Sequence, residues 1–225
     1  MTGEKALEEE SSARSPRVER RRRAVRAKIL SAAEALMRAG SVDDVTIAQI
    51  TAAADVGHGT FYLHFQTKHE VMVAIAREHA ERLTTRLDAL TESIADPAEV
   101  VAVSVRYVVR AIREDRLWNW FVLGSSMPHE NLRECVAISA TRDFQRGRDE
   151  GRFEWNDAPV LAAFISGAIL GVLSDPATSD LRGDTAEKVA ELLLVTLGVP
   201  RAEAIGIARR RLPPLAPEGR PSTVL

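Results

Sequence analysis

The sequence has one cysteine among its 225 residues, Cys135, so an intramolecular disulfide framework is excluded and a reducing compartment is expected. The N-terminal segment is rich in Glu and Arg and has no apolar core, which argues against a signal peptide. The longest apolar run, Pro159–Leu173, is interrupted by Ser166 and Gly167 and is shorter than the roughly 18 residues needed to span a bilayer. We therefore expect a cytoplasmic protein, associated with the nucleoid if it binds DNA.

Catalytic patterns are also missing from the sequence. Ser, His and Asp do not stand in a recognisable motif, there is no glycine-rich phosphate loop, and His and Cys do not cluster at metal-ligand spacing. His69 and His79 are ten residues apart, which is not a chelating spacing on a helix. We expect no enzymatic activity, no cofactor and no metal. Apolar residues at 45% and charged residues at 28% are instead typical of an ordinary globular protein.

The overall charge of −2 hides an asymmetry along the chain. Residues 14–28 contain eight basic residues and one acid, Glu19, whereas residues 1–13 contain four Glu and one Lys, and the remainder is acidic on balance. A basic module near one end of an acidic chain indicates a polyanionic partner at that end. The alternative is a solvated charged face without a partner. The motif that follows the basic segment favours nucleic acid.

The stretch from Val45 to Lys68 has the pattern of two short helices joined by a tight turn. Thr46 and Gln49 form a T-x-x-Q capping box at the start of the first helix. One apolar face of that helix is predicted at helical spacing: Ile47, Ile50 and Ala54. The segment Asp55-Val56-Gly57 then breaks the pattern with residue types that tolerate turn geometry.

The second short helix is expected to run from Thr60 to His64. Phe61 and Phe65 are expected to point inward. Its outer face carries groups that can form hydrogen bonds: His58, Thr60, Tyr62 and His64. Two short helices, a turn of three to four residues and a polar outer face describe a helix-turn-helix, whose second helix reads the major groove of DNA.

The same stretch resembles a known family. The sequence GTFYLHFQTKHE is similar to the signature of TetR-type bacterial transcriptional regulators, and TIAQITAAADV resembles their second helix. The resemblance is dense over residues 20–75. It implies that the following residues contact DNA: Thr46, Ile47, Ala48, His58, Gly59, Thr60, Tyr62, His64 and Lys68. Leu63 is a further candidate contact, which either touches a thymine methyl or is merely exposed. Asp55, Gly57 and Leu63 depart from the usual family residues, so the family's base preference is least transferable there.

Residues 1–18 are polar and are predicted to be disordered, either as a solubilising tail or as an arm that follows DNA. A helix is expected from Arg20 to Ala39, with Gly40 in the usual C-terminal position. Arg21, Arg22 and Arg23 lie in its first turns, where cations oppose the helix dipole. We interpret this cluster as binding phosphate.

The rest of the chain is predicted to be helical. A long helix from Thr67 to about Glu92, opened by a T-x-x-E box, is long enough to couple a DNA-binding domain to a helical body. Asp96-Pro97-Ala98-Glu99 begins another helix, and a further one runs from about Pro128 to Arg148 and is closed by Gly151. The fold class is therefore all-α. The expected parts are a tail (1–18), a helix-turn-helix domain (19–66), a ligand-binding and dimerisation domain (67–212) and a disordered tail (213–225).

Two nearly all-apolar helices are predicted at about Ala158–Leu173 and Thr185–Leu197, the second with a D-x-x-E box at Asp184 and Glu187. Helices that are apolar on more than one side must bury more than one side, either inside one subunit or in a two-fold dimer. The dimer is favoured, and the TetR-type family builds its interface from the last two long helices. The candidate interface residues are Leu161, Phe164, Ile165, Ala168, Ile169, Val172, Val189, Leu192 and Leu193.

The body also concentrates aromatic residues, which either form an ordinary core or line a ligand pocket. The candidate pocket residues are Trp118, Trp120, Phe121, Met127, His129, Cys135 and Phe144. Their low charge predicts an apolar or aromatic effector. The sequence thus predicts a dimeric, ligand-responsive regulator, and a repressor in particular, on a palindromic operator. The alternatives are an architectural or nonspecific DNA-binding protein, and a helical enzyme for which no acid–base pair can be named.

Overall fold

The computed structural model describes residues 16–124, 128–179 and 184–216. Within these ranges the chain forms helices and no strands, as the all-α prediction required. The chain divides into two compact units, Met1–Ile75 and Ala76–Leu225. The division lies inside one helix, α5 (Lys68–Thr91), so this helix belongs to both units. None of the described helices is long and apolar enough to cross a membrane.

The first unit contains α2 (Pro16–Ala39), α3 (Ile47–Ala53), α4 (His58–Tyr62) and the first residues of α5. Helix α3 packs against both α2 and α4. Apolar side chains from all four helices and the connecting segments form the core, which includes Ile29, Leu30, Ala33, Met37, Val45, Ile50, Phe61, Phe65, Val71 and Met72. Of the apolar residues predicted at helical spacing in α3, Ile50 and Ala54 are buried in this core and Ile47 is half-buried.

Helix α2 begins at Pro16, four residues before the predicted start at Arg20. Proline suits the first turn of a helix because its missing N–H would have no partner there, and its backbone angle is already helical. Glu19 is favourable at the same end and pairs with Arg23, with Arg23 Nε 3.6 Å from Glu19 Oε1. Residues 16–18, expected in a disordered tail, are therefore helical, while residues 1–15 lie outside the described residues.

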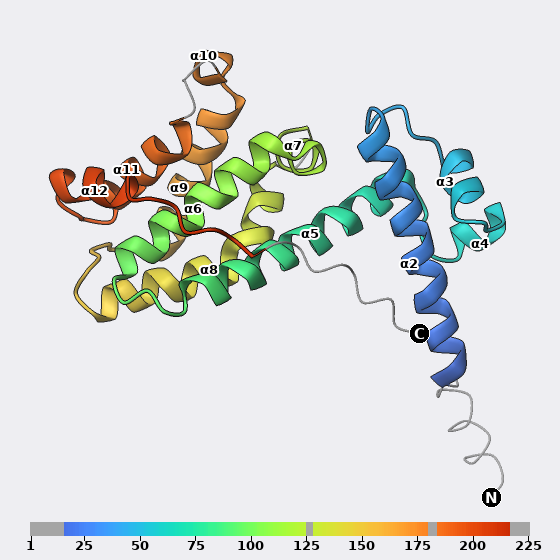
Figure 1. Ribbon diagram of the computed structural model, residues 1–225, viewed down its shortest axis with the longest axis horizontal. Helices are drawn as coiled ribbons and strands as arrows, with labels where there is room; N and C mark the ends of the chain where they lie inside the picture. The colour runs from blue at the N-terminus through green and yellow to red at the C-terminus, as the bar shows by residue number, and fades with distance from the viewer. Residues whose placement is uncertain (1–15, 125–127, 180–183, 217–225) are drawn as a thin grey trace, which may run out of the picture. The chain divides into compact units, whose positions relative to one another are not determined.

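The second unit contains the rest of α5 and seven further helices, named here in chain order: α6 (Pro97–Glu114), α7 (Arg116–Leu123), α8 (Pro128–Asp149), α9 (Ala158–Ser174), α10 (Pro176–Ser179), α11 (Thr185–Thr196) and α12 (Arg201–Ala208). Helix α6 is its centre, because it packs against α7, α8, α9, α11 and α12 (Figure 1). Its start agrees with the predicted signal: Asp96 caps the helix by accepting from Ala98 N–H at 2.9 Å, and Pro97 follows. Gly151, predicted to close α8, has a φ of 68° that favours glycine.

Two predicted capping boxes differ from the structure. At α11, Asp184 occupies the cap position but its side chain accepts no capping hydrogen bond and pairs with Lys188 at 3.0 Å, while Glu187 pairs with Arg106 at 2.6 Å and Arg110 at 2.7 Å. These bonds hold the pKa of Glu187 below its ordinary value even though burial raises it. At α5, Thr67 Oγ1 accepts from Glu70 N–H, but the Glu70 carboxylate accepts from Gln66 N–H rather than from Thr67. In both cases the carboxylate that the sequence pattern assigns to the cap bonds elsewhere. Glu187 pairs with two arginines, and Glu70 accepts from the backbone amide of Gln66.

The segment after α12 is packed against the second unit and is not a free tail up to Ala216. Arg106 Nη1 donates to the Arg210 carbonyl at 2.8 Å, and Tyr107 donates its hydroxyl to the carbonyl of Pro213. Arg86 Nε donates to the carbonyl of Ala216 at 2.8 Å. The segment therefore crosses α6 and reaches α5 (Figure 1). Residues 213–216, expected to be disordered, are held by these bonds, and 217–225 lie outside the described residues.

Candidate DNA-reading surface and effector cavity

The start of α3 is fixed by the predicted capping box. Thr46 N–H donates to Gln49 Oε1 at 2.8 Å, and Gln49 N–H donates to Thr46 Oγ1 at 3.2 Å. Both amides are therefore satisfied without any other part of the chain. Thr46 and Ala48 are exposed and Ile47 is half-buried, so this helix start is open to a partner.

The turn between α3 and α4 depends on one residue with left-handed backbone geometry. Asp55 has a φ of 53°, a conformation in which glycine is usual and Asp is tolerated at modest cost. Val56 N–H donates to the carbonyl of Thr51 at 3.0 Å and closes the turn. Gly57 caps α4 with no side-chain bond, as its lack of a side chain predicted. The departure at Asp55 thus leaves the turn intact.

Helix α4 separates an inner and an outer face as predicted, although it ends at Tyr62, two residues earlier than expected. Phe61 and Phe65 are 0% and 4% exposed, respectively, and belong to the core. On the outer side, Tyr62 is 46% and Leu63 is 74% exposed. Of the remaining candidate DNA contacts, His58 and Gly59 are exposed, and Thr60 and His64 are half-buried. The outer side therefore offers a phenol, a hydroxyl and imidazoles together, which can bond to phosphates and base edges.

The basic residues of α2 act electrostatically on the end of α4. The pKa of His64 lies below its ordinary value because of partial burial and because of the positive charges of Arg22 and Arg26. The Arg26 guanidinium also lies 5.2 Å from the centre of the Phe65 ring. His64 is consequently a neutral hydrogen-bonding group near neutral pH. Arg21, Arg22 and Arg23 are all exposed, as a phosphate-binding cluster requires.

Lys68 has a role that the sequence pattern did not reveal. As the first residue of α5 it was expected to bind phosphate, yet its Nζ donates to the carbonyl of Asp43 at 2.6 Å and lies 3.5 Å from that of Val42. The ammonium therefore joins the start of α5 to the segment between α2 and α3. No local signal could have predicted this bond, because the partners are backbone atoms 25 and 26 residues away.

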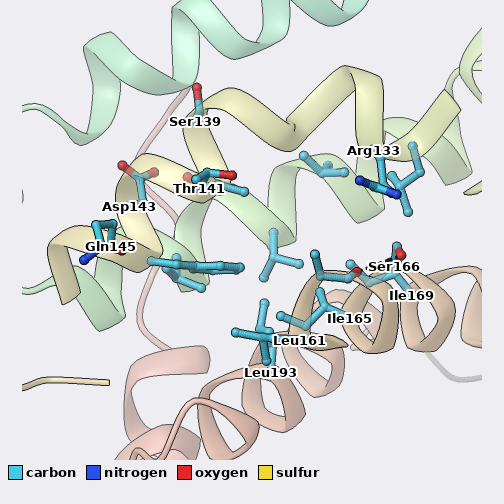
Figure 2. A pocket seen from close by; sticks show the side chains of 18 of the residues that line it. Arg133, Ser139, Thr141, Asp143, Gln145, Leu161, Ile165, Ser166, Ile169 and Leu193 are labelled. Carbon is cyan, nitrogen blue, oxygen red and sulfur yellow. Dashed lines mark hydrogen bonds between the residues drawn. The ribbon is translucent and has the colours of Figure 1, made fainter. Parts of the chain in front are cut away.

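The second unit contains a cavity of about 270 Å³ that opens among α5, α6, α8, α9 and α11. Most of its lining is apolar, including Leu87, Val101, Val105, Val108, Leu132, Phe144, Trp155, Leu161, Ile165, Ile169 and Leu193. Figure 2 shows Leu161, Ile165 and Leu193 on one side of the cavity, with Ser139, Thr141 and Asp143 on the other. Thr84, Leu87 and Asp88 come from α5, so this helix lines the cavity and also begins in the first unit.

Only some of the candidate pocket residues line the cavity. Phe144 lines the cavity, whereas Trp118, Trp120 and Phe121 of α7 lie outside its described lining. Trp118 and Phe121 are buried in the core, at 4% and 0% exposure. Met127 lies outside the described residues, as do the side chains of His129 and Cys135. Trp118 and Phe121 of α7 therefore belong to the core. The helical periodicity of the sequence does not distinguish core aromatic residues from cavity-lining ones such as Trp155.

One end of the cavity carries an ionic bridge between α5 and α8. Arg142 Nη2 lies 2.9 Å from Asp88 Oδ1, and Arg142 Nε donates to Asp143 Oδ1 at 2.9 Å. Ser139 Oγ lies 3.4 Å from Asp88 Oδ2. The two carboxylates raise the pKa of Arg142, which stays protonated. Asp88, Ser139 and Asp143 line this polar end, and Arg142, outside the described lining, bridges the two carboxylates. The arrangement was not anticipated because its residues come from two distant segments.

Some candidate dimer residues line the cavity and others are exposed on the surface. Leu161, Ile165, Ile169 and Leu193 line the cavity. In contrast, the described surface of α9 and α11 exposes large apolar side chains at Val160 (65%), Phe164 (60%), Leu192 (62%) and Val195 (40%), and Ala168 is exposed with them. Val189 is buried and Val172 is half-buried. We call the exposed set, Val160, Phe164, Ala168, Leu192 and Val195, the α9/α11 apolar face.

Both units of the chain match known protein families. Residues 29–75 match the family model described as bacterial regulatory proteins, tetR family, and residues 96–210 match the tetracyclin repressor-like C-terminal domain. The chain is similar to the crystal structure of RolR in complex with resorcinol, with 33% identity, 88% of this chain and 100% of that chain covered, and a TM-score of 0.79.

Other solved structures share the fold at lower identity. SmeT, repressor of the Stenotrophomonas maltophilia multidrug efflux pump SmeDEF, is 26% identical over 77% of this chain and 88% of its own, with a TM-score of 0.55. FadR from Bacillus halodurans is 19% identical over 81% and 97%, with a TM-score of 0.58. Among curated proteins there is no match.

Proposed function

Because the chain belongs to the tetR family of bacterial regulatory proteins, whose members are DNA-binding transcription regulators and not enzymes, we propose that it is a dimeric repressor released from a palindromic operator by a small apolar or aromatic effector. The observation that carries the proposal is the outer side of α4. It presents Tyr62, Thr60 and His64 on a helix-turn-helix whose start and turn are locally fixed. Recognition helices of a two-fold dimer lie about 34–36 Å apart and read successive major grooves.

The α9/α11 apolar face supports a homodimer. Phe164 and Leu192 are more than half exposed, and a monomer would leave them in water. A second copy of the same face closes the assembly with one two-fold contact. The candidates Phe164, Ala168 and Leu192 lie on this face. Leu161, Ile165, Ile169 and Leu193 instead connect the same two helices to the cavity, so an effector would contact the helices that hold the dimer together.

The size and lining of the cavity support a small effector. A dry cavity of about 150 Å³ accepts benzene, and the cavity here is larger, at about 270 Å³. It therefore has room for one ring with substituents. RolR, a similar chain over its whole length, has been solved with resorcinol. A ligand that favours one position of α5 would change operator affinity by population shift, since α5 lines the cavity and begins at Lys68.

Selection of bound sequences from a random duplex pool tests the DNA-binding proposal. We expect a palindrome with half-sites about one helical turn apart. Titration of the selected duplex and of a scrambled duplex at several salt concentrations then measures specificity. Equal affinity for both duplexes at every salt concentration would replace the proposal with an architectural, nonspecific DNA-binding protein. Loss of retardation on adding a small aromatic compound would identify the effector response.

A further inference from the structure

The two sides of the cavity differ in chemistry, and this difference selects among possible effectors. Ten or more apolar side chains form the walls, whereas Asp88 and Asp143 bring two carboxylates to one end, with Arg142 between them. These three groups have a formal charge of −1. Arg133 is the cation in the described lining; it lies towards the opposite end of α8 (Figure 2) and is exposed, whereas Arg142 is not part of that lining. At the carboxylate end the side chains of Asp88 and Arg142 are 38% and 54% exposed, so Asp143 is the enclosed polar group there.

Asp143 is the most confined of these groups, at 8% exposure. Arg142 Nε and Nη2 both approach the same oxygen, Oδ1, at 2.9 Å. Among the described residues no donor is found on Oδ2 of Asp143. A carboxylate held in one orientation by Arg142, with its second oxygen unused by the protein, is a ready acceptor for a ligand donor. Thr141 and Gln145 of the same helix also line the cavity and can add bonds to such a ligand.

We propose that the effector is an uncharged ring compound bearing hydroxyl groups, one of which donates a hydrogen bond to Asp143 beside the Asp88–Arg142–Asp143 bridge. Asp143 is then a specificity-determining residue and Arg142 a positioning residue. The inference rests on the proposed function only in taking this cavity as the effector site.

Three other ligand classes fit less well. A ligand carboxylate would face two carboxylates and one guanidinium at this end, which is repulsive overall. A protonated amine would be attracted by Asp143, but burying an ammonium among valine and leucine side chains costs far more than burying a hydroxyl. A ring without a donor would leave the Asp143 carboxylate desolvated and without a new bond. A phenol, with a pKa near the tyrosine value of about 10, is neutral at pH 7 and supplies the donor.

Isothermal titration calorimetry on the full-length protein without DNA tests the proposal directly. The probes are phenol, resorcinol, catechol and hydroquinone, compared with 1,3-dimethoxybenzene, benzoate and benzylamine. We expect at least one hydroxylated probe to bind, and to bind at least about tenfold more tightly than the dimethoxy compound, since a hydrogen bond to a charged group contributes this much or more. Tighter binding of benzoate, benzylamine or the dimethoxy compound overturns the proposal, as does failure of all four hydroxylated probes to bind.

The Asp143→Asn variant assigns the bond to a residue. We expect the affinity for the best hydroxylated probe to fall about 10- to 100-fold, with the preference over the dimethoxy compound reduced. Asp149→Asn is the matched control, because Asp149 is on the same helix but outside the described lining, and an Asn oxygen can still accept from Gln145. Its affinity should stay at the wild-type value. Wild-type affinity in Asp143→Asn would overturn the assignment.

Asp88→Asn is the second variant, in case Asp143→Asn disturbs folding. It keeps Asp143 and an oxygen for Arg142, and the amide NH2 that replaces the other oxygen can donate to Ser139 Oγ. The preference for hydroxylated over dimethoxy probes should therefore persist; its loss would overturn the role of Asp143. Operator retardation measured on the same proteins separates the two proposals. If the protein binds its operator specifically but does not prefer hydroxylated probes, this inference is wrong and the regulator proposal stands. If it prefers hydroxylated probes but shows no operator specificity, the regulator proposal is wrong and this inference stands.

Discussion

The ammonium of Lys68 lies 2.6 Å from the carbonyl oxygen of Asp43, and this bond joins the first residue of α5 to the segment that precedes α3. The start of α5 is therefore attached directly to the DNA-binding unit by a side chain as well as by the chain itself. A residue that the family resemblance assigns to DNA is, in the free protein, part of the domain's internal support. We propose that DNA binding and domain stability are linked at this position.

Lys68→Ala should weaken operator binding and also destabilise the first unit. Loss of a charge-assisted bond to a carbonyl should lower the free energy of unfolding by about 1 kcal/mol, or more if Asp43 and Val42 keep no other donor. Chemical denaturation followed by circular dichroism measures this. An unchanged unfolding midpoint together with weaker DNA binding would show that Lys68 serves DNA alone.

Tyr62→Phe should affect DNA binding without affecting stability. Tyr62 is 46% exposed, and its ring packs edge-on against Phe61 with centroids 5.5 Å apart, a contact that phenylalanine retains. Removing the hydroxyl should reduce operator affinity about 3- to 10-fold, the effect of one hydrogen bond. Fluorescence anisotropy with labelled operator measures it. Wild-type affinity would remove Tyr62 from the set of DNA contacts.

His64 should make the stability of the protein depend on pH. The pKa of His64 lies below its ordinary value of 6.5, mainly through burial and further through Arg22 and Arg26. The unfolded chain therefore takes up a proton at higher pH than the folded one. The contribution of neutral His64 to the free energy of unfolding is fully present above pH 6.5. It is lost as the pH falls through the pKa that His64 has in the folded protein. Denaturation at about pH 7.5 and about pH 5.5 should show a larger difference for wild type than for His64→Gln, and equal differences would contradict the prediction.

Ala168→Asp should split the dimer. The residue is exposed on α9 beside Phe164, so a carboxylate there would be buried without a partner in a two-fold contact. Sedimentation velocity should show a monomer, and operator affinity should fall because one recognition helix no longer positions the other. Ala202→Asp on α12 is the control, since Ala202 is exposed and is not one of the residues of the α9/α11 apolar face. A dimer in both variants would show that Ala168 is outside the interface.

The sequence by itself determined the features that depend on neighbouring residues. The Thr46–Gln49 box, the left-handed Asp55 and the inward Phe61 and Phe65 all follow from spacings of a few positions, and each is present in the structure. Backbone satisfaction and helical periodicity act over one or two turns, so a local pattern contains the necessary information. The all-α class and the order of α5, α6, α8, α9 and α11 follow in the same way, whereas α7 and α10 were not predicted as separate helices.

Only the tertiary structure decided which partner each polar group takes and which side of an apolar helix faces inward. Glu187 leaves its predicted cap for Arg106 because the packing of α6 on α11 brings a buried guanidinium within 2.6 Å. Helix α9 is apolar on all sides, so its composition could not show that Leu161 lines a cavity while Phe164 is exposed. The Asp88–Arg142–Asp143 bridge likewise requires α5 and α8 to be adjacent. Ion pairing and burial depend on distances between remote segments, and these exist only once the helices have packed.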